Sequence, residues 1–330
     1  MNIPLLALIS FFITFSAFLP FINLLYKLKL KDPNPGKHRD VFGKETPIFK
    51  KLRSGTSGTP IGGGLLIVSV VTILSVLYFQ FIGEWNTEIL GILVTFVAFM
   101  LLGLFDDLKK TFHFKGGPFE LRVRQKFVLE LIISSAISYW LVKEGLLHIS
   151  IPGLFEITNP YLLVGLSSVG MTFMLNAYNI TDGVDGLSGG TLSIVLIGVL
   201  GLASFVGNTT VGVFSALLLG GLLAYLYFNI HPARLLMGDT GSLAFGSVLC
   251  MLLLIMDFAY LIPILGLIYI VEALSSLIQW ISRRFMKKKV FDAAPLHYHL
   301  ENRGWHQTKV TMRAYLAQAI LVLIALSLVL

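Results

Sequence analysis

The sequence predicts an all-α, polytopic membrane protein that crosses the bilayer about ten times. Three observations support this fold class. Hydrophobic residues make up 55% of the 330 residues, and the mean hydropathy is +0.82. Only 13% of the residues are charged, about half the fraction that is usual in a soluble domain. Several apolar runs reach the roughly 20 residues that a helix needs to cross a bilayer.

Ten apolar runs define the expected transmembrane helices, with boundaries good to a few residues. The single cysteine, Cys250, lies inside one run, so we expect neither a disulfide framework nor a thiolate metal site. The first run has no basic leader and is followed by lysines, which favours a membrane helix over a secretory signal. The runs cover residues 3–25, 61–83, 88–105, 126–142, 160–180, 188–206, 210–228, 241–258, 260–281 and 314–330.

Lysine and arginine residues set the expected orientation of these helices. The connections after the first, third, seventh and ninth runs carry nine, six, one and eight basic residues, and only Lys143 lies in another connection. The positive-inside rule makes the basic side cytoplasmic, which puts both termini outside. The net charge of +7 is therefore a sign of topology, and we do not expect nucleic-acid binding. No internal repeat is evident.

The longest connection expected outside covers residues 143–159 and reads KEGLLHISIPGLFEITN. Its alternating apolar residues and its Pro-Gly pair fit a small outer β-hairpin. They fit an irregular cap about equally well.

Polar motifs gather in the connections expected on the cytoplasmic side. They read TSGTPIGGG, LFDDLKK, NAYNITDGVDG, NIHPARLLMGDTGS and APLHYHLENRGW. A random scatter of polar residues would not favour one face so consistently, so we expect one composite site at that membrane surface. The connections that form it cover residues 26–60, 106–125, 181–187, 229–240 and 282–313.

The acidic residues of these motifs each allow two interpretations. Asp106 and Asp107 end a helix, where the helix dipole disfavours carboxylates unless a nearby cation offsets it. Asp182 and Asp185 fit a polar turn as well as a site. Asp239 begins a helix, where an acid is favourable as a cap. Together, five carboxylates without thiols point to a hard cation such as Mg²⁺, which binds through carboxylates and substrate phosphates.

Three further features stay open between a structural and a functional role. The glycines of TPIGGG fit an anion-binding helix start or close helix packing. The two histidines of HYH share a face only in an extended chain, and each could be a surface residue or a ligand. Acids inside the membrane mark function or pair internally, and the basic run RRFMKKK is typical of contact with lipid headgroups. The residues concerned are His297, His299, Glu130, Glu272 and 283–289.

Taken together, NAYNITDGVDGL, MGDTGSLA, the aspartate pair of LFDDLKK and PLHYHLENRGW resemble the polyprenyl-phosphate N-acetylhexosamine-1-phosphate transferases. The resemblance is strongest to the members that act in peptidoglycan synthesis, and it extends over nearly the whole chain. It implies one transferase domain, residues 1–330, in a bacterial plasma membrane with a cytoplasmic active site. The resemblance therefore also implies a part in cell wall biogenesis, cell shape and cell division, which depend on peptidoglycan synthesis.

The resemblance also implies a reaction. Phospho-N-acetylmuramoyl-pentapeptide moves from its UDP-activated form (UDP-MurNAc-pentapeptide) to undecaprenyl phosphate, which gives lipid I and UMP with Mg²⁺ as the cofactor. The lipid bilayer is a further partner, and a homodimer is left open. Matching positions imply catalytic roles for Asp106, Asp107, Asp239, His297 and His299. They imply substrate or nucleotide binding by Asn176, Asn179, Asp182, Asp185 and Asn229, and metal binding by Asp239 and Asp182.

Several positions depart from the family pattern and keep alternatives open. The middle residue of a triple-histidine motif is Tyr298, Thr56 stands where a lysine is usual, and Leu236 replaces a phenylalanine. One alternative is a transferase for UDP-GlcNAc or a similar sugar that feeds another surface glycan. Another is a catalytically inactive scaffold. An ion-coupled transporter is a third, although its acids should lie near the middle of the bilayer.

Overall fold

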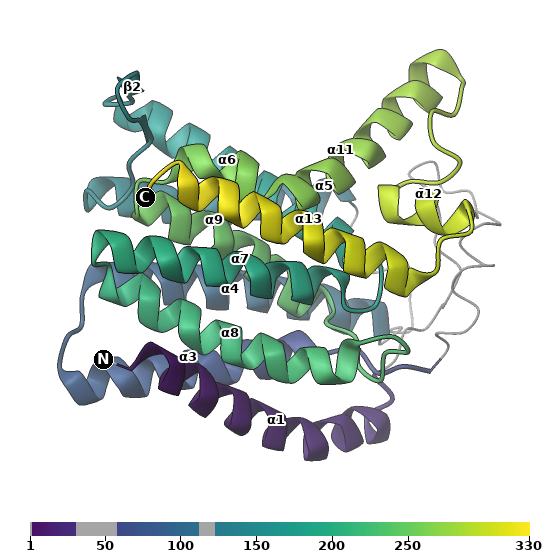
Figure 1. Cartoon of the computed structure of the whole chain (residues 1–330), viewed down its shortest axis with the longest axis horizontal. Coiled ribbons are helices and arrows are strands. Elements are labelled where there is room, and N and C mark those ends of the chain that lie inside the picture. Colours follow the sequence, from purple (N-terminus) through teal and green to yellow (C-terminus); the bar gives the residue numbers. More distant parts are fainter. Residues whose placement is uncertain (1, 31–57, 112–122) are drawn as a thin grey trace.

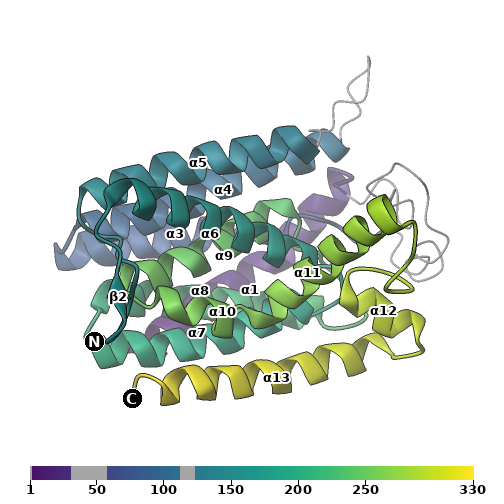
Figure 2. The ribbon, with the colours of Figure 1, turned by 90° about the horizontal axis from the view of Figure 1, so that it is seen from above.

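The computed structural model of the chain describes residues 2–30, 58–111 and 123–330. Within these ranges, long helices lie side by side along one direction, as two perpendicular views show (Figures 1 and 2). The long helices are α1 (Ile3–Lys27), α3 (Gly63–Ile82), α4 (Thr87–Thr111), α5 (Val123–Lys143), α6 (Pro160–Thr181), α7 (Leu187–Val206), α8 (Thr209–Asn229), α9 (Asp239–Ile255), α11 (Leu267–Ile281) and α13 (Gln307–Ser327). The short elements are β1 (Ser150–Ile151), β2 (Phe155–Glu156), η1 (Ala259–Leu261), α10 (Ile262–Leu265), η2 (Ser282–Met286) and α12 (Leu296–Asn302).

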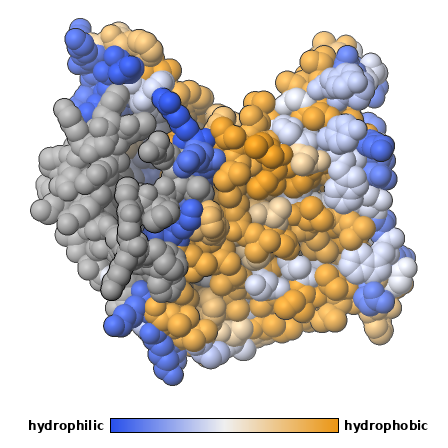
Figure 3. All heavy atoms as spheres, turned by 180° about the vertical axis from the view of Figure 1, so that it is seen from behind, coloured by the Kyte–Doolittle hydropathy of each residue, from blue (hydrophilic) through white to orange (hydrophobic). Residues whose placement is uncertain are grey.

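The helices confirm an all-α polytopic membrane protein. In the described ranges, eight helices are long and apolar enough to cross a membrane, and a bent pair raises the number to nine. The predicted run 241–258 corresponds to α9, which has 17 residues. The count of ten therefore stays a prediction. An apolar band covers much of one face, with polar residues along its edges (Figure 3).

The predicted run 260–281 is a broken helix. Ala259–Leu265 and Leu267–Met286 meet at an angle of 72°. A break leaves backbone carbonyls without helical partners, and the fully buried Gln318 donates its Nε2–H to the Leu265 carbonyl at 3.0 Å. Because of this bend, the far end of α11 leans away from the bundle (Figures 1 and 2).

Glycines bring α9 against its neighbours almost backbone to backbone. A Cβ atom placed on Gly64 would lie 2.2 Å from the Cα of Gly241, and one on Gly103 would lie 2.2 Å from the carbonyl oxygen of Asp239. Small residues allow such close approach in membrane bundles, where packing rather than hydrophobicity drives association. The first turn of α9 is therefore fixed between α3 and α4.

Both chain ends lie at the end of the bundle where β1 and β2 lie, and α12 lies at the opposite end (Figures 1 and 2). Within residues 143–159, β1 and β2 pair antiparallel, with Ser150 opposite Glu156 and Ile151 opposite Phe155. Which side of the membrane holds these ends stays a prediction.

Candidate active site

Two carboxylates and two ammonium groups form a closed network where α4, α5 and α9 meet. Lys110 Nζ lies 3.0 Å from Asp106 Oδ2 and 2.7 Å from Asp239 Oδ2. Lys126 Nζ lies 3.3 Å and 2.6 Å from the same two oxygens. The side chains of Asp106 and Asp239 are only 4% and 15% exposed. The two carboxylates therefore face one small region that holds both ammonium groups.

Asp107 faces a different way from its neighbour in sequence. Its Oδ1 accepts the backbone N–H of Asp239 at 3.1 Å, and its Oδ2 accepts the N–H and the hydroxyl of Thr240 at 2.9 and 2.7 Å. The first N–H groups of a helix have no partner inside the helix. Asp107 on α4 thus caps α9 from outside, since α9 has no side-chain cap of its own.

The asparagines of α6 reach toward this network. Asn179 Nδ2 donates to Asp239 Oδ1 at 2.9 Å and to Ser242 Oγ at 2.6 Å. One turn earlier, Asn176 Nδ2 donates to Glu130 Oε2 at 2.6 Å and to the Thr172 carbonyl at 2.9 Å. Glu130, on α5 one turn after Lys126, is fully buried. This intramembrane acid pairs internally with Asn176.

The acids of the 181–187 connection hold its turn. Asp182 Oδ1 accepts the hydroxyl of Ser188 on α7 at 2.5 Å. Asp185 Oδ2 lies 2.9 Å from His231 Nδ1 and accepts the N–H of Ala233 at 3.0 Å. Asp185 is buried, and its Oδ1 has no partner among the described residues. Asp185 therefore joins this turn to the 229–240 connection and keeps one acceptor atom unused.

Asn229 ties the same two connections together. Its Oδ1 accepts the N–H of Gly186 at 2.9 Å, and its Nδ2 donates to the Leu235 carbonyl at 2.9 Å. Asn229 is 3% exposed, so its amide acts here as a backbone brace.

The glycine-rich segment pairs with the 229–240 connection instead of opening toward an anion. The N–H groups of Gly62 and Gly63 donate to the Leu236 carbonyl at 3.1 and 2.9 Å, and that of Gly64 donates to the Met237 carbonyl at 3.0 Å. Leu236 N–H returns a bond to the Pro60 carbonyl at 2.9 Å. Close packing is thus the role that the structure favours for TPIGGG.

His297 is buried at the inner side of α12. Its Nδ1 lies 3.0 Å from Glu272 Oε2, which also accepts the His297 N–H at 3.2 Å. The side chain is 0% exposed. A Cβ atom on Gly183 would lie 2.3 Å from His297 Nε2, so this nitrogen faces the backbone of the 181–187 connection. Glu272, an acid expected inside a span, is thereby paired.

Tyr298 and His299 contact different parts of the chain. Tyr298, which departs from the family pattern, donates its hydroxyl to the Gly183 carbonyl at 3.0 Å. His299 Nδ1 accepts the N–H of Asp292 at 3.2 Å. Asp292 Oδ2 in turn accepts the Arg303 Nε–H at 2.9 Å, which lowers the pKa of the Asp292 carboxyl. His299 therefore orders the α12 segment, while Tyr298 touches the turn.

The expected site residues thus fall into three groups. Asp106, Asp239 and Asn179 share one network with Lys110 and Lys126. A second group holds the 181–187 turn or a neighbouring helix in place, and His299 lies apart from both. Thr56 lies outside the described residues. Asp182, Asp185, Asn229 and His297 hold the turn, Asp107 caps α9, and Asn176 pairs with Glu130 on α5.

Lys110 and Lys126 were not predicted as site residues from the sequence, where both counted as basic residues that set the topology. The position of Lys110 could have revealed its role, because Asp106 and Lys110 are four residues apart, the distance at which side chains meet on a helix. No local feature of the sequence indicated that Lys126 contacts Asp239, which lies 113 residues later.

The donor set at this network suits a hard cation. Carboxylate oxygens of Asp106 and Asp239 already surround positive charge, and Mg²⁺ takes one or two carboxylates with substrate phosphates and water. Among the described residues, no group of three or more His, Cys, Asp or Glu side chains is placed to hold a metal ion. Two protein carboxylates fit a metal whose remaining ligands come from the substrate.

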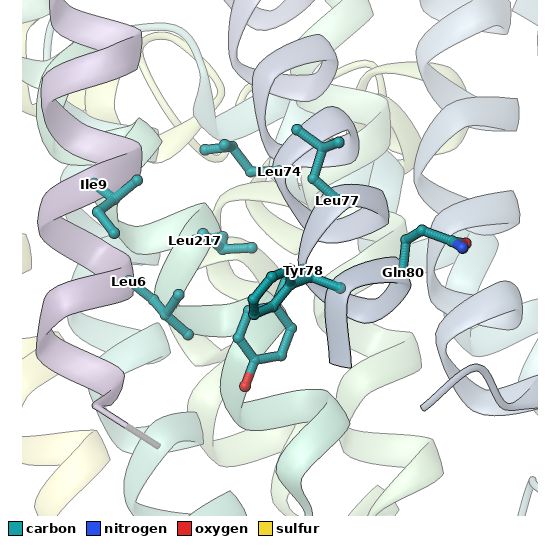
Figure 4. Close-up of a pocket in the computed structure, with 8 residues that line it drawn as sticks. Leu6, Ile9, Leu74, Leu77, Tyr78, Gln80 and Leu217 are labelled. Carbon is teal, nitrogen blue, oxygen red and sulfur yellow. The ribbon is translucent and has the colours of Figure 1, made fainter. Parts of the chain in front are cut away.

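A hollow elsewhere has a different character. It lies between α1, α3 and α8 toward the end with the termini, and Figure 4 shows apolar side chains pointing into it. Tyr78 and Gln80 are its polar members, and no carboxylate, histidine, lysine or arginine lines it. It does not offer the chemistry of the charged network.

Comparison with known proteins identifies the family of the chain. Residues 89–257 match the model of glycosyl transferase family 4. The chain belongs to this family. The matched range contains Asp106, Lys110, Lys126 and Asp239, so the whole charged network lies within the family region. The family resemblance found in the sequence is thereby confirmed.

Relatives in this family match nearly the full chain. A protein of Caldanaerobacter subterraneus subsp. tengcongensis named phospho-N-acetylmuramoyl-pentapeptide-transferase is 36% identical over 304 residues, 91% of this chain and 90% of its own. Proteins with the same name from Clostridium perfringens (strain 13) and Clostridium acetobutylicum are 34% and 33% identical, each covering 92% of both chains. The match extends past the family region, since it covers about nine-tenths of the chain.

Proposed function

We propose that the chain transfers phospho-N-acetylmuramoyl-pentapeptide from UDP-MurNAc-pentapeptide to undecaprenyl phosphate, giving lipid I and UMP in peptidoglycan synthesis. Relatives of that name, similar over about nine-tenths of the chain, support the substrates. One structural observation carries the chemistry: Lys110 and Lys126 lie against Asp106 and Asp239 at one end of a membrane bundle. Charged side chains at the end of a membrane bundle suit a reaction between a water-soluble diphosphate and a lipid phosphate.

The two ammonium groups supply the phosphate contacts in this proposal. Both substrates bring phosphates, and a lysine ammonium binds phosphate as a point charge. Lys126 is 16% exposed and Lys110 40% exposed, so the surroundings screen their charges less than bulk water would. They would hold the acceptor phosphate and the donor diphosphate side by side. Each ammonium group would then share its contacts between a carboxylate and a phosphate.

The reaction is an in-line displacement. An oxygen of the lipid phosphate forms a bond to the β-phosphorus, and the bond from that phosphorus to the bridging oxygen breaks, so UMP leaves with the electron pair. A phosphate monoester has a second pKa near ~6 and is largely ionised at pH 7. It needs no strong base, so positioning and charge neutralisation carry the catalysis.

Magnesium is a further part of the proposal. Asp106 and Asp239 would hold it, because one oxygen of each already faces the same two ammonium groups. When bound, the metal neutralises charge on the diphosphate and the leaving group. Asn179 keeps Asp239 oriented through its amide. The sequence prediction that Asp182 is a second ligand stays a prediction, since Asp182 accepts from Ser188.

The membrane placement follows from the same proposal. We place the charged network on the cytoplasmic side of a bacterial plasma membrane, where nucleotide-activated donors are made. The basic connections on that side support this orientation. The braced turn at residues 181–187 would form one wall of the nucleotide site.

A two-donor assay tests the reaction. Purified protein receives undecaprenyl phosphate, Mg²⁺ and either UDP-MurNAc-pentapeptide or UDP-GlcNAc, and released UMP is measured. We expect UMP from the pentapeptide donor and little from UDP-GlcNAc. The reverse preference would assign the chain to another surface glycan, and no UMP from either donor would favour an inactive scaffold. Asp106→Ala and Asp239→Ala test the site, because near-normal release in both variants contradicts it.

A further inference from the structure

The far end of α11 forms a projecting tip, residues 280–290, that the proposed reaction does not use. The 72° bend after α10 turns α11 away from the bundle. The tip lies at the same end as α12 and stands clear of the other helices in two views (Figures 1 and 2). It is therefore available to a partner outside the bundle.

Large apolar side chains at the tip are exposed. Phe285 is 73% exposed, Met286 64% and Val290 55%. The helix that leads to them shows the same property, since Leu274, Leu277 and Ile281 are 40 to 45% exposed. The apolar face of α11 thus continues into the tip without interruption, which is expected of a surface that enters lipid.

Basic side chains flank these apolar ones in the sequence. Arg284, Lys287, Lys288 and Lys289 are all exposed. In the described ranges, Arg284, Lys287 and Lys288 form no ion pair, while Lys289 lies near Asp292. Four cations with little internal neutralisation attract a partner of negative charge.

The tip has a fixed shape. Gln279 Oε1 accepts the N–H groups of Val290 and Phe291 at 3.1 and 3.0 Å, and its Nε2 donates to the Phe291 carbonyl at 2.9 Å. Ser282 donates to the Lys288 carbonyl at 2.9 Å. Two polar side chains of the outgoing helix therefore hold the returning chain, which keeps the cations grouped.

We propose that the α11 tip is a binding site for anionic phospholipid headgroups in the leaflet on the side of the charged network. Interleaved basic and large apolar residues are the composition that lies in a membrane interface, and lysine or arginine near an anionic surface adds attraction per cation. Continuity with the exposed face of α11 favours a lipid over a soluble acidic partner, because that face already requires an apolar environment.

The test compares lipid compositions around the intact protein. The full chain is placed in nanodiscs of phosphatidylcholine alone or with phosphatidylglycerol, and hydrogen exchange is followed in peptides covering residues 283–291. We expect phosphatidylglycerol to slow exchange there severalfold. Inorganic phosphate added to phosphatidylcholine discs should leave exchange unchanged, since free phosphate lacks the interface that positions a headgroup.

Two variants complete the design. The first variant combines Arg284→Gln, Lys287→Gln, Lys288→Gln and Lys289→Gln and should abolish the lipid effect. Each cation removed should lower the local enrichment of anionic lipid roughly fivefold. Lys27→Gln with Lys29→Gln removes exposed cations at the end of α1 and should preserve it. Equal exchange of the wild-type tip in the two lipids would overturn the proposal, and so would an equal response to free phosphate. The wild-type comparison decides even if the fourfold variant fails to fold.

Discussion

The carboxylate of Asp107 caps the helix that begins at Asp239. It accepts the N–H of Asp239 at 3.1 Å and the N–H of Thr240 at 2.9 Å. Its neighbour Asp106 instead faces Lys110 and Lys126. Two adjacent acids therefore have different tasks: Asp106 contributes charge to the network, and Asp107 holds Asp239 at the place where it completes that network.

This division predicts different outcomes for the two acids. Asp107→Ala leaves two N–H groups and the Thr240 hydroxyl without their acceptor, at about 1–3 kcal/mol, and Asp239 should shift. We expect lower thermal stability and lower UMP release together. Asp106→Asn, the control, should lower UMP release with a small change in melting temperature. Equal melting temperatures for Asp107→Ala and wild type would contradict the capping role.

The contact between α3 and α9 predicts that Gly64 cannot be enlarged. Gly64→Ala would bring a methyl group within 2.2 Å of the Gly241 Cα, and overpacking of this kind costs about 1–3 kcal/mol. We expect a lower melting temperature in detergent. Gly165→Ala on α6 is the matched control, since nothing lies within 4 Å of its Cβ position. A similar loss in both variants would mean that the contact is not the cause.

The charged network predicts a large effect of removing one ammonium group. Lys126→Gln leaves Asp239 with Lys110 as its one listed cation partner at 2.7 Å, and it removes a proposed phosphate contact. We expect UMP release to fall by about 100-fold, the usual scale for losing one preorganised group. Lys109→Gln is the control, because Lys109 lies 4.1 Å from the Phe105 ring centre. Comparable losses in the two variants would argue against a specific role for Lys126.

The pair formed by Glu130 and Asn176 predicts energetic coupling. Asn176 Nδ2 lies between two acceptors, Glu130 Oε2 and the Thr172 carbonyl, so the amide has one favoured orientation. Glu130→Leu and Asn176→Leu should each destabilise the protein, and the double variant should cost less than their sum by about 0.5–3 kcal/mol. Melting temperatures of the four proteins give the coupling. Strict additivity would show that the two side chains act independently.

The apolar runs of the sequence predicted much of this architecture. Apolar runs located the helices because most side chains that face lipid or the core are apolar. The break at Gly266 was missed, because the run 260–281 is continuous in hydropathy and the donor that satisfies Leu265 comes from Gln318 on a distant helix. Local composition does not reveal such a partner.

The sequence named the acids of the candidate site together but not the different contacts that each one makes. The acids of LFDDLKK were named together, yet neighbouring residues on a helix point about 100° apart, and only packing against α9 shows which one meets Asp239. The glycines of TPIGGG and the buried Glu130 each allowed two roles. Contacts with Met237 and Asn176, from distant parts of the chain, distinguish them.

The turn that follows α6 is held by parts of the chain that are made much later. Tyr298, Thr311 and Tyr315 donate to the carbonyls of Gly183, Asp185 and Gly186, across 115, 126 and 129 residues of sequence. During synthesis, the turn leaves the ribosome well before these residues exist. A growing chain can therefore insert most of its helices before the turn acquires these three contacts, which form only when α12 and α13 arrive.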